Sequence, residues 1–235
     1  MKKRRFFALF LVLGLLVSLL SVPASAFEEI DVDARAALLV EKETGEILYE
    51  KNAHEKNYPA SITKLTVALL VFEAIDAGQL SLDQPITAHE SAFEGLSIYG
   101  STAGIKVGEV LTVEQLLQCM LIVSANEACN ILGETLYGSV DAFVARMNER
   151  ATELGCEHTH FANATGLHNS QHYTTAWDLY LITREALKHD KFMEICNSKS
   201  YTVPATNMTD KPRELHSTNF LISNWRARGY VYRDA

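Results

Sequence analysis

The sequence has few cysteines and fewer basic than acidic residues, and both shortages exclude some classes of protein. Its four cysteines, Cys119, Cys129, Cys156 and Cys196, have spacings that fit neither a small disulfide framework nor a CxxC metal knuckle. We therefore expect buried free thiols rather than disulfides. Removing the four basic residues at positions 2–5 from the 21 Lys and Arg leaves 17 against 29 Asp and Glu, a net charge of about −12. This acidic balance argues against nucleic acid as a partner and leaves no basic patch for anionic lipid.

The first 26 residues have the order of a secretory signal peptide. Four basic residues, 2–5, precede an apolar run, Phe6 to Leu20, and Ala24-Ser25-Ala26 supplies a small-x-small cleavage site. The alternative is an uncleaved membrane anchor, which the shortness of the apolar run disfavours. The rest contains no internal repeat and no low-complexity linker. We predict a signal peptide over residues 1–26 and one domain over residues 27–235.

Helical patterns fill the middle of the chain, and strand-like pieces lie at both ends. Residues 36–40 and 46–50 flank Glu43-Thr44-Gly45 and predict a β-hairpin. Turn and short-strand signals follow at 80–86, and residues 201–232 alternate short apolar and polar pieces. Helices are predicted at Pro59 to Gly78, Thr112 to Val123, Glu127 to Leu136, Val140 to Leu154 and Thr174 to Leu187. One hairpin cannot cover several apolar helices, so we expect further strands beyond Ala235 and a truncated sequence.

The helix after Pro59 is apolar on nearly every side, yet its first turn carries Ser61 and Lys64. Residues three apart share a helix face, so the Lys64 amine can reach the Ser61 hydroxyl. Apolar walls and the positive end of the helix both disfavour an ammonium ion, which favours a lysine that acts as a base. Free N–H groups at the helix end, that of Ser61 included, are available to an oxyanion. The pair predicts a nucleophile and its base, although a capping serine and a solvated lysine would give the same spacing.

A second polar group, Ser124-Ala125-Asn126, interrupts the following helical region. A sharp turn there would aim a hydroxyl and an amide into a cleft. Ser124 is a candidate to relay a proton between Lys64 and a leaving amine, and Asn126 a candidate to hold a substrate amide. The alternative is an ordinary helix-breaking cap.

Ser-x-x-Lys followed by Ser-x-Asn resembles the motif set of the serine D-alanyl-D-alanine peptidases and serine β-lactamases. Residues 36–235 resemble most the low-molecular-weight penicillin-binding proteins, which are D-alanyl-D-alanine carboxypeptidases. The landmarks are Pro59 to Lys64, Ser124 to Cys129, Phe161 to Leu167 and Tyr173 to Leu179.

This resemblance implies an α+β fold, an α/β sandwich of the β-lactamase and DD-peptidase type, with a helical subdomain on an antiparallel sheet. Residues 27–235 would then be the penicillin-binding catalytic domain. Ser61 would form an acyl-enzyme, Lys64 would be its base, and Ser124 and Asn126 would complete the centre, without metal or cofactor. The substrate would be the D-Ala-D-Ala end of a peptidoglycan stem peptide, and β-lactams would be covalent inhibitors of an exported, cell-envelope enzyme.

The family's third motif, Lys-Thr-Gly on an edge strand, is absent. Lys42-Glu43-Thr44-Gly45 has an insertion and lies in the predicted hairpin. We expect the motif just past Ala235, and with it possible membrane association through a C-terminal segment. A protein of these 235 residues alone is expected to show little or no peptidase activity.

Three alternatives remain open at this point. His158, His160, His168 and His172 crowd one polar segment and suggest a zinc peptidase, although exposed loop histidines are the simpler interpretation. A class A-like β-lactamase shares the first two motifs but needs a Glu-x-x-x-Asn segment, where this chain reads Glu157-His158-Thr159-His160-Phe161. A non-catalytic, penicillin-recognising cell-wall module would keep the fold without acylation of Ser61.

Overall fold

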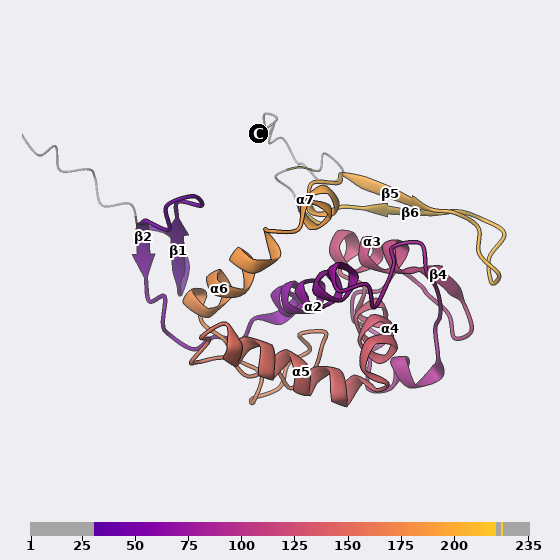
Figure 1. The fold of residues 1–235 in the computed structure, drawn as a ribbon, viewed down its shortest axis with the longest axis horizontal. Helices are drawn as coiled ribbons and strands as arrows, with labels where there is room; N and C mark the ends of the chain where they lie inside the picture. Colours follow the sequence, from indigo (N-terminus) through magenta and orange to yellow (C-terminus); the bar gives the residue numbers. More distant parts are fainter. Residues whose placement is uncertain (1–30, 220–221, 223–235) are drawn as a thin grey trace, which may run out of the picture. The chain divides into compact units, whose positions relative to one another are not determined.

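The structure, a computed structural model, describes residues 31–219 and residue 222. The chain divides into two units, residues 1–34 and residues 35–235. The helices and strands described below belong to the second unit (Figure 1). The predicted signal peptide lies outside the described residues.

The described strands are β1 (Ala37–Val40), β2 (Ile47–Lys51), β3 (Pro85–Thr87), β4 (Val110–Thr112), β5 (Ser200–Val203) and β6 (Arg213–His216). The helices are η1 (Ala60–Thr63), α2 (Lys64–Asp76), η2 (Glu90–Phe93), α3 (Val113–Val123), α4 (Asn126–Tyr137), α5 (Val140–Glu153), α6 (Ala176–Ala186) and α7 (Asp190–Cys196).

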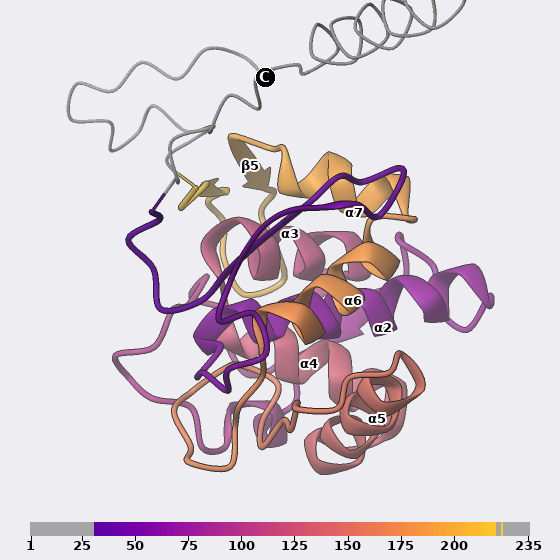
Figure 2. The same cartoon turned by 90° about the vertical axis from the view of Figure 1, so that its left-hand side faces the viewer.

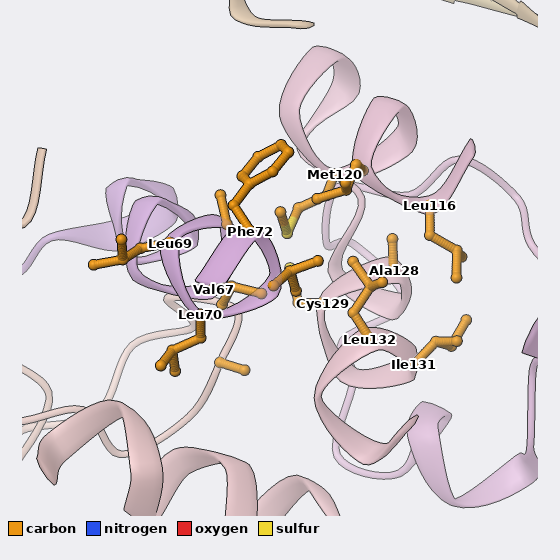
Figure 3. Close-up of a cluster of buried hydrophobic side chains, with 14 of the residues drawn as sticks. Val67, Leu69, Leu70, Phe72, Leu116, Met120, Ala128, Cys129, Ile131 and Leu132 are labelled. Carbon is orange, nitrogen blue, oxygen red and sulfur yellow. The ribbon is translucent and has the colours of Figure 1, made fainter. Parts of the chain in front are cut away.

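Helix α2 is the centre of the second unit. It contacts α3, α4, α5 and α6, which lie around it in Figure 2. An apolar surface on every side is what such a surrounded helix requires, and the sequence of α2 provides it. Figure 3 shows its side chains packed against those of α3 and α4; the buried residues labelled there are Val67, Leu69, Leu70, Phe72, Leu116, Met120, Ala128, Cys129, Ile131 and Leu132. Because α2 is enclosed in this way, a polar side chain on its first turn is removed from water.

Three small antiparallel sheets contact this helical core. The hairpin β1–β2, predicted from the sequence, contacts α6 through β1, and the hairpin β5–β6 contacts α3. A third pair, β3–β4, joins residues 85–87 to residues 110–112. This mixture confirms the α+β class. Within the part of the chain that the structure describes, the strands form three two-stranded sheets rather than one, and further strands beyond Ala235 stay a prediction.

The helix boundaries follow their caps closely. Thr112 caps α3 in a reciprocal capping box with Gln115, and Ser139 caps α5. Gly138 ends α4 in the left-handed conformation. The short helix α7 and the strand β4 were not predicted, because each is too short to show a periodic pattern.

The four cysteines are free, three of them buried and Cys196 half-buried, which confirms the prediction of free thiols. In the described ranges, no helix has the length and apolar character needed to cross a membrane.

Candidate active site

Ser61 lies on a single 3-10 turn, η1, that leads directly into α2. The sequence predicted one continuous helix from Pro59, whereas the structure has a 3-10 turn before α2. Ala60, at the start of this turn, has a φ of 47°, in the left-handed region that a regular helix does not contain. Ser61 is exposed, whereas Lys64 is only 3% exposed. The candidate nucleophile therefore faces solvent while its partner lies beneath it.

The Lys64 amine contacts three oxygens. Its Nζ lies 3.3 Å from Ser61 Oγ, 2.8 Å from Asn126 Oδ1 and 2.8 Å from the carbonyl oxygen of Thr165. The amide and carbonyl oxygens only accept hydrogen bonds. A neutral amine can donate its two N–H groups to them and keep its lone pair for the Ser61 hydroxyl proton. The geometry therefore fits a lysine that acts as a base.

Burial lowers the pKa of Lys64, because an ammonium ion is poorly solvated in this apolar surrounding. Negative charge on Cys129 and Glu127 would oppose this shift. Burial also raises the pKa of the Cys129 thiol to about 12, so at neutral pH the thiol is uncharged. Glu127 is then the charge that opposes the desolvation of Lys64.

Ser124 and Asn126 occupy the sharp turn between α3 and α4, as predicted. Ser124 has φ 62° and ψ 34°, a left-handed conformation that reverses the chain at the end of α3. Asn126 begins α4 and reaches Lys64, and its backbone N–H donates to the Ser101 carbonyl at 2.9 Å. Among the described residues, the buried Ser124 Oγ has no hydrogen-bond partner. The structure thus joins Ser61, Lys64 and Asn126 by hydrogen bonds and leaves the Ser124 hydroxyl unengaged.

A second loop completes the surroundings of Lys64, and sequence reasoning assigned it no role. Asn163 Oδ1 accepts hydrogen bonds from Thr165 N, Thr165 Oγ1 and Gly166 N, and its side-chain amide donates to the Leu167 carbonyl. This turn holds the Thr165 carbonyl at Lys64. The available signal was the Asn-x-x-Gly spacing inside the landmark Phe161 to Leu167, which is typical of a side-chain-stabilised turn.

The four histidines between residues 158 and 172 were expected to be exposed loop residues, and the structure agrees for only some of them. His160 and His168 are exposed, but His172 is only 2% exposed, so the expectation of exposed loop histidines is wrong for His172. His172 makes hydrogen bonds to Thr63 and to the backbone of Ala162, which account for its burial. Throughout the described ranges, no group of three or more His, Cys, Asp or Glu is arranged to hold a metal ion.

A cavity of about 280 Å³ opens beside Asn126, between the start of α4 and residues 96–102. Ile98 and Tyr99, in the same loop, are 88% and 92% exposed. Glu127 secures this loop by accepting hydrogen bonds from Thr102 Oγ1 at 2.7 Å and from Ala103 N at 2.8 Å. A larger cavity, about 440 Å³, lies between β1 and α6 and is lined by none of the four predicted site residues. Of the four predicted site residues, Asn126 lines the smaller cavity.

A family model described as D-alanyl-D-alanine carboxypeptidase matches residues 23–227. The D-alanyl-D-alanine carboxypeptidase DacF of Bacillus subtilis is 35% identical over 214 residues, covering 88% of this chain and 54% of that protein. DacC of Escherichia coli is 32% identical over 200 residues, covering 83% and 50% of the two chains. The chain therefore spans about half the length of these curated relatives.

The crystal structure of the D-alanyl-D-alanine carboxypeptidase DacD from Francisella tularensis is similar, with a TM-score of 0.71 and 33% identity over 81% of this chain and 44% of that one. Penicillin binding protein 6B from Escherichia coli has a TM-score of 0.74 and 27% identity over 84% and 62% of the two chains. A family match over most of the chain, on a fold shared with these peptidases, agrees with the motif resemblance: this protein belongs to the D-alanyl-D-alanine carboxypeptidase family.

Proposed function

We propose that this protein acts as a serine D-alanyl-D-alanine carboxypeptidase, which removes the terminal D-alanine from peptidoglycan stem peptides through an acyl-enzyme on Ser61. One observation carries the proposal: the buried Lys64 amine lies 3.3 Å from the exposed Ser61 hydroxyl while two acceptor oxygens occupy its N–H groups. A neutral lysine amine held in this way can accept the proton of the Ser61 hydroxyl.

In the acylation step, Ser61 Oγ attacks the carbonyl carbon of the terminal peptide bond and its proton passes to Lys64. The tetrahedral oxyanion accepts a hydrogen bond from the backbone N–H of Ser61 at the helix end. The C–N bond then breaks, and the proton moves from Lys64 to the leaving D-alanine amine. We assign the relay of that proton to Ser124, whose buried Oγ has no hydrogen-bond partner in the described part of the chain and is therefore available for it.

The acyl-enzyme is resolved by water. Lys64 takes a proton from the water molecule, the hydroxide attacks the ester carbonyl, and the proton returns to Ser61 Oγ as the shortened peptide leaves. The side-chain oxygen of Asn126 accepts a hydrogen bond from Lys64, so its NH₂ group can donate to an amide oxygen of the substrate. None of these steps calls on a metal ion or a cofactor.

The site of action proposed here is the cell envelope. An export signal over residues 1–26 and a peptidoglycan substrate both support it, and possible membrane association through a C-terminal segment is part of the proposal. The acidic composition gives no support to a nucleic-acid partner.

A fluorescent penicillin tests this function directly, because a β-lactam carbonyl acylates the same serine that the peptide does. For a full-length protein that contains these residues together with the Lys-Thr-Gly strand, we expect stoichiometric labelling, a mass increase equal to one penicillin on the peptide that contains Ser61, and no label in Ser61→Ala. Release of D-alanine from a synthetic D-Ala-D-Ala pentapeptide is the second measurement. Absence of any covalent label would favour the non-catalytic module.

The rate of label loss distinguishes the remaining alternatives. A carboxypeptidase of this class is expected to hold the penicilloyl group for many minutes, since the chain has no Glu-x-x-x-Asn segment to activate a deacylating water. Rapid multiple turnover of penicillin would indicate a β-lactamase instead. Activity that is lost with a chelator and survives Ser61→Ala would indicate a metal peptidase.

A further inference from the structure

The peptide bond between Ala60 and Ser61 has an unusual supporting structure. Ala60 adopts a φ of 47°, a conformation that is unfavourable for an L-residue other than glycine, so neighbouring contacts must hold it. The bond is planar, which means that the direction of its C=O fixes the direction of its N–H. This N–H is the oxyanion donor of the proposed mechanism. Whatever holds the Ala60 carbonyl therefore also aims the Ser61 N–H.

The Ala60 carbonyl accepts a hydrogen bond from the hydroxyl of Thr63 at 2.7 Å. The same hydroxyl oxygen lies 2.7 Å from His172 Nε2. Because the Thr63 proton is already given to Ala60, the Thr63 oxygen must accept from the histidine. His172 therefore carries its proton on Nε2.

The other face of the imidazole supports this assignment independently. The backbone N–H of Ala162 donates to His172 Nδ1 at 3.1 Å, and a backbone N–H can only donate. Nδ1 is consequently the acceptor nitrogen of a neutral ring. Burial lowers the pKa of His172 to about 4, in agreement with a neutral imidazole at neutral pH. Three hydrogen bonds therefore form a series in which each group donates to the next: Ala162 N–H to His172, His172 to Thr63, and Thr63 to the Ala60 carbonyl. We call this series the hydrogen-bond chain.

The hydrogen-bond chain is buried, and the Ala60 carbonyl at its end makes a second contact, with Gly166. Thr63 is fully buried and His172 nearly so, so water does not compete for these hydrogen bonds. Gly166 also packs directly on this peptide: a Cβ there would lie 1.9 Å from Ala60 O and 2.9 Å from Ser61 N. Only glycine permits this approach, so the Ala60 carbonyl is in contact with both the glycine backbone and the Thr63 hydroxyl.

We propose that His172 is a positioning residue for acylation: through the Thr63 hydroxyl it fixes the Ala60–Ser61 peptide, and so aims the Ser61 N–H at the oxyanion and Ser61 Oγ toward Lys64. This inference rests on the proposed role of Ser61 and adds a residue that touches neither substrate nor nucleophile. Hydrogen bonding at the carbonyl end also polarises the peptide, which strengthens its N–H as a donor.

Two pairs of variants test the chain by penicillin acylation of the protein carrying this sequence. Thr63→Val keeps the side-chain shape and removes the hydroxyl, whereas Thr63→Ser keeps the hydroxyl. His172→Leu removes both ring nitrogens, whereas His172→Gln offers an amide that can donate to Thr63 and accept from Ala162. We expect the acylation rate constant to fall about tenfold or more in Thr63→Val and His172→Leu and to be largely rescued in the conservative partners. The dissociation constant of the non-covalent penicillin complex should change less than threefold.

The double variant Thr63→Val/His172→Leu provides the coupling test. If both residues act through one chain, its acylation rate equals that of the slower single variant; multiplied effects would mean that they act separately and would overturn the proposal. His89→Gln, which replaces an exposed histidine at the start of η2, is the control and should acylate at the wild-type rate.

Nuclear magnetic resonance of the imidazole nitrogens gives a readout that does not depend on activity. We expect the Nε2–H tautomer of His172 at pH 7, with the Nε2–H resonance shifted in Thr63→Val. An Nδ1–H tautomer, or a protonated ring, would overturn the proposal even if Ser61 is acylated normally. The expected tautomer together with an unlabelled wild-type protein would instead refute the proposed function, so the two failures are distinct.

Discussion

At the residue scale, the proposed chemistry depends on how easily Lys64 loses its proton. Burial lowers the pKa of this lysine, and the charge of Glu127 opposes the shift. Glu127→Gln removes that charge but keeps an amide oxygen for the hydrogen bonds from Thr102 and Ala103. We therefore expect the acidic limb of the acylation pH profile to move to lower pH in this variant, because the neutral amine becomes more populated. The measurement is the penicillin acylation rate from pH 5 to pH 10.

Glu94→Gln is the matched control, since it removes the same charge from an exposed residue where solvent screens it. Its profile should coincide with that of the wild type. A profile that moves to higher pH in Glu127→Gln, or does not move, would show that the Glu127 charge does not act on Lys64.

The site could be predicted in part at this scale. Ser61, Lys64 and Asn126 follow from motif spacing, since three-residue spacing on a helix brings side chains together and a helix break exposes polar groups. Neither the Thr165 carbonyl nor the His172 contact could be found in that way. The first is a backbone atom, which has no sequence signature, and the second joins Thr63 to a residue far along the chain. Tertiary packing alone decides both.

At the scale of elements, the close approach of the 161–167 loop to η1 determines where Ser61 lies. Gly166 and Gly155 share a φ of 84°, so replacing either by alanine imposes a similar backbone strain, about 1 kcal/mol. Only Gly166 also faces backbone, because a Cβ at Gly155 would meet nothing within 4 Å. We expect Gly166→Ala to lower penicillin acylation by at least a hundredfold or to prevent folding, and Gly155→Ala to lower stability slightly with acylation unchanged.

Circular dichroism and thermal unfolding of both variants separate these outcomes. If Gly166→Ala folds and acylates like the wild type, the contact between the loop and η1 does not position Ser61. If the two variants lose penicillin acylation to a similar extent, the loss comes from backbone strain at the replaced glycine and not from the contact between Gly166 and η1.

The helices could be predicted more completely than the strands. The five long helices have sustained apolar patterns or helix-forming runs with start or stop signals, and each appears within a few residues of its predicted bounds. The strands β3 and β4 have three residues each and pair across more than twenty intervening residues, so neither local propensity nor turn chemistry identifies the partner. The 3-10 turn at Ser61 was also missed, since nothing in the sequence marks the left-handed φ of Ala60, whose carbonyl contacts Thr63 and Gly166.

At the scale of the whole molecule, two buried groups link folding stability to pH in separate ranges. His172 has a folded pKa of about 4 against 6.5 in the unfolded chain, with burial as the main cause and the neighbouring His160 as the second. Glu109 is fully buried, pairs with Arg213 at 2.9 Å and has a pKa below its usual 4.5, since its hydrogen bonds and Arg213 outweigh desolvation. The stability that Glu109 contributes is present above pH 4.5 and is lost as the pH falls further.

The sign for His172 follows from which state binds the proton. Between pH 6.5 and pH 4 the unfolded chain takes up a proton that the folded protein refuses, so the free energy of unfolding falls as the pH falls through this range. The full shift corresponds to about 3 kcal/mol, reached near pH 4, and it makes no difference above pH 7. His172→Gln does not titrate, so its unfolding free energy from urea denaturation should be flatter between pH 6.5 and pH 4, whatever its value at pH 7.5.

The comparison rests on slopes, because His172→Gln also changes hydrogen bonds that affect stability at every pH. His89→Gln, an exposed replacement, should keep the wild-type slope, and both variants should keep the steeper loss below pH 4.5 that Glu109 contributes. Equal slopes for His172→Gln and wild type between pH 6.5 and pH 4 would mean that His172 binds its proton equally well in both states. Burial would then give no reason for His172 to be neutral between Thr63 and Ala162. The orientation of the Ala60–Ser61 peptide would have to depend on Gly166 and the Thr63 hydroxyl alone.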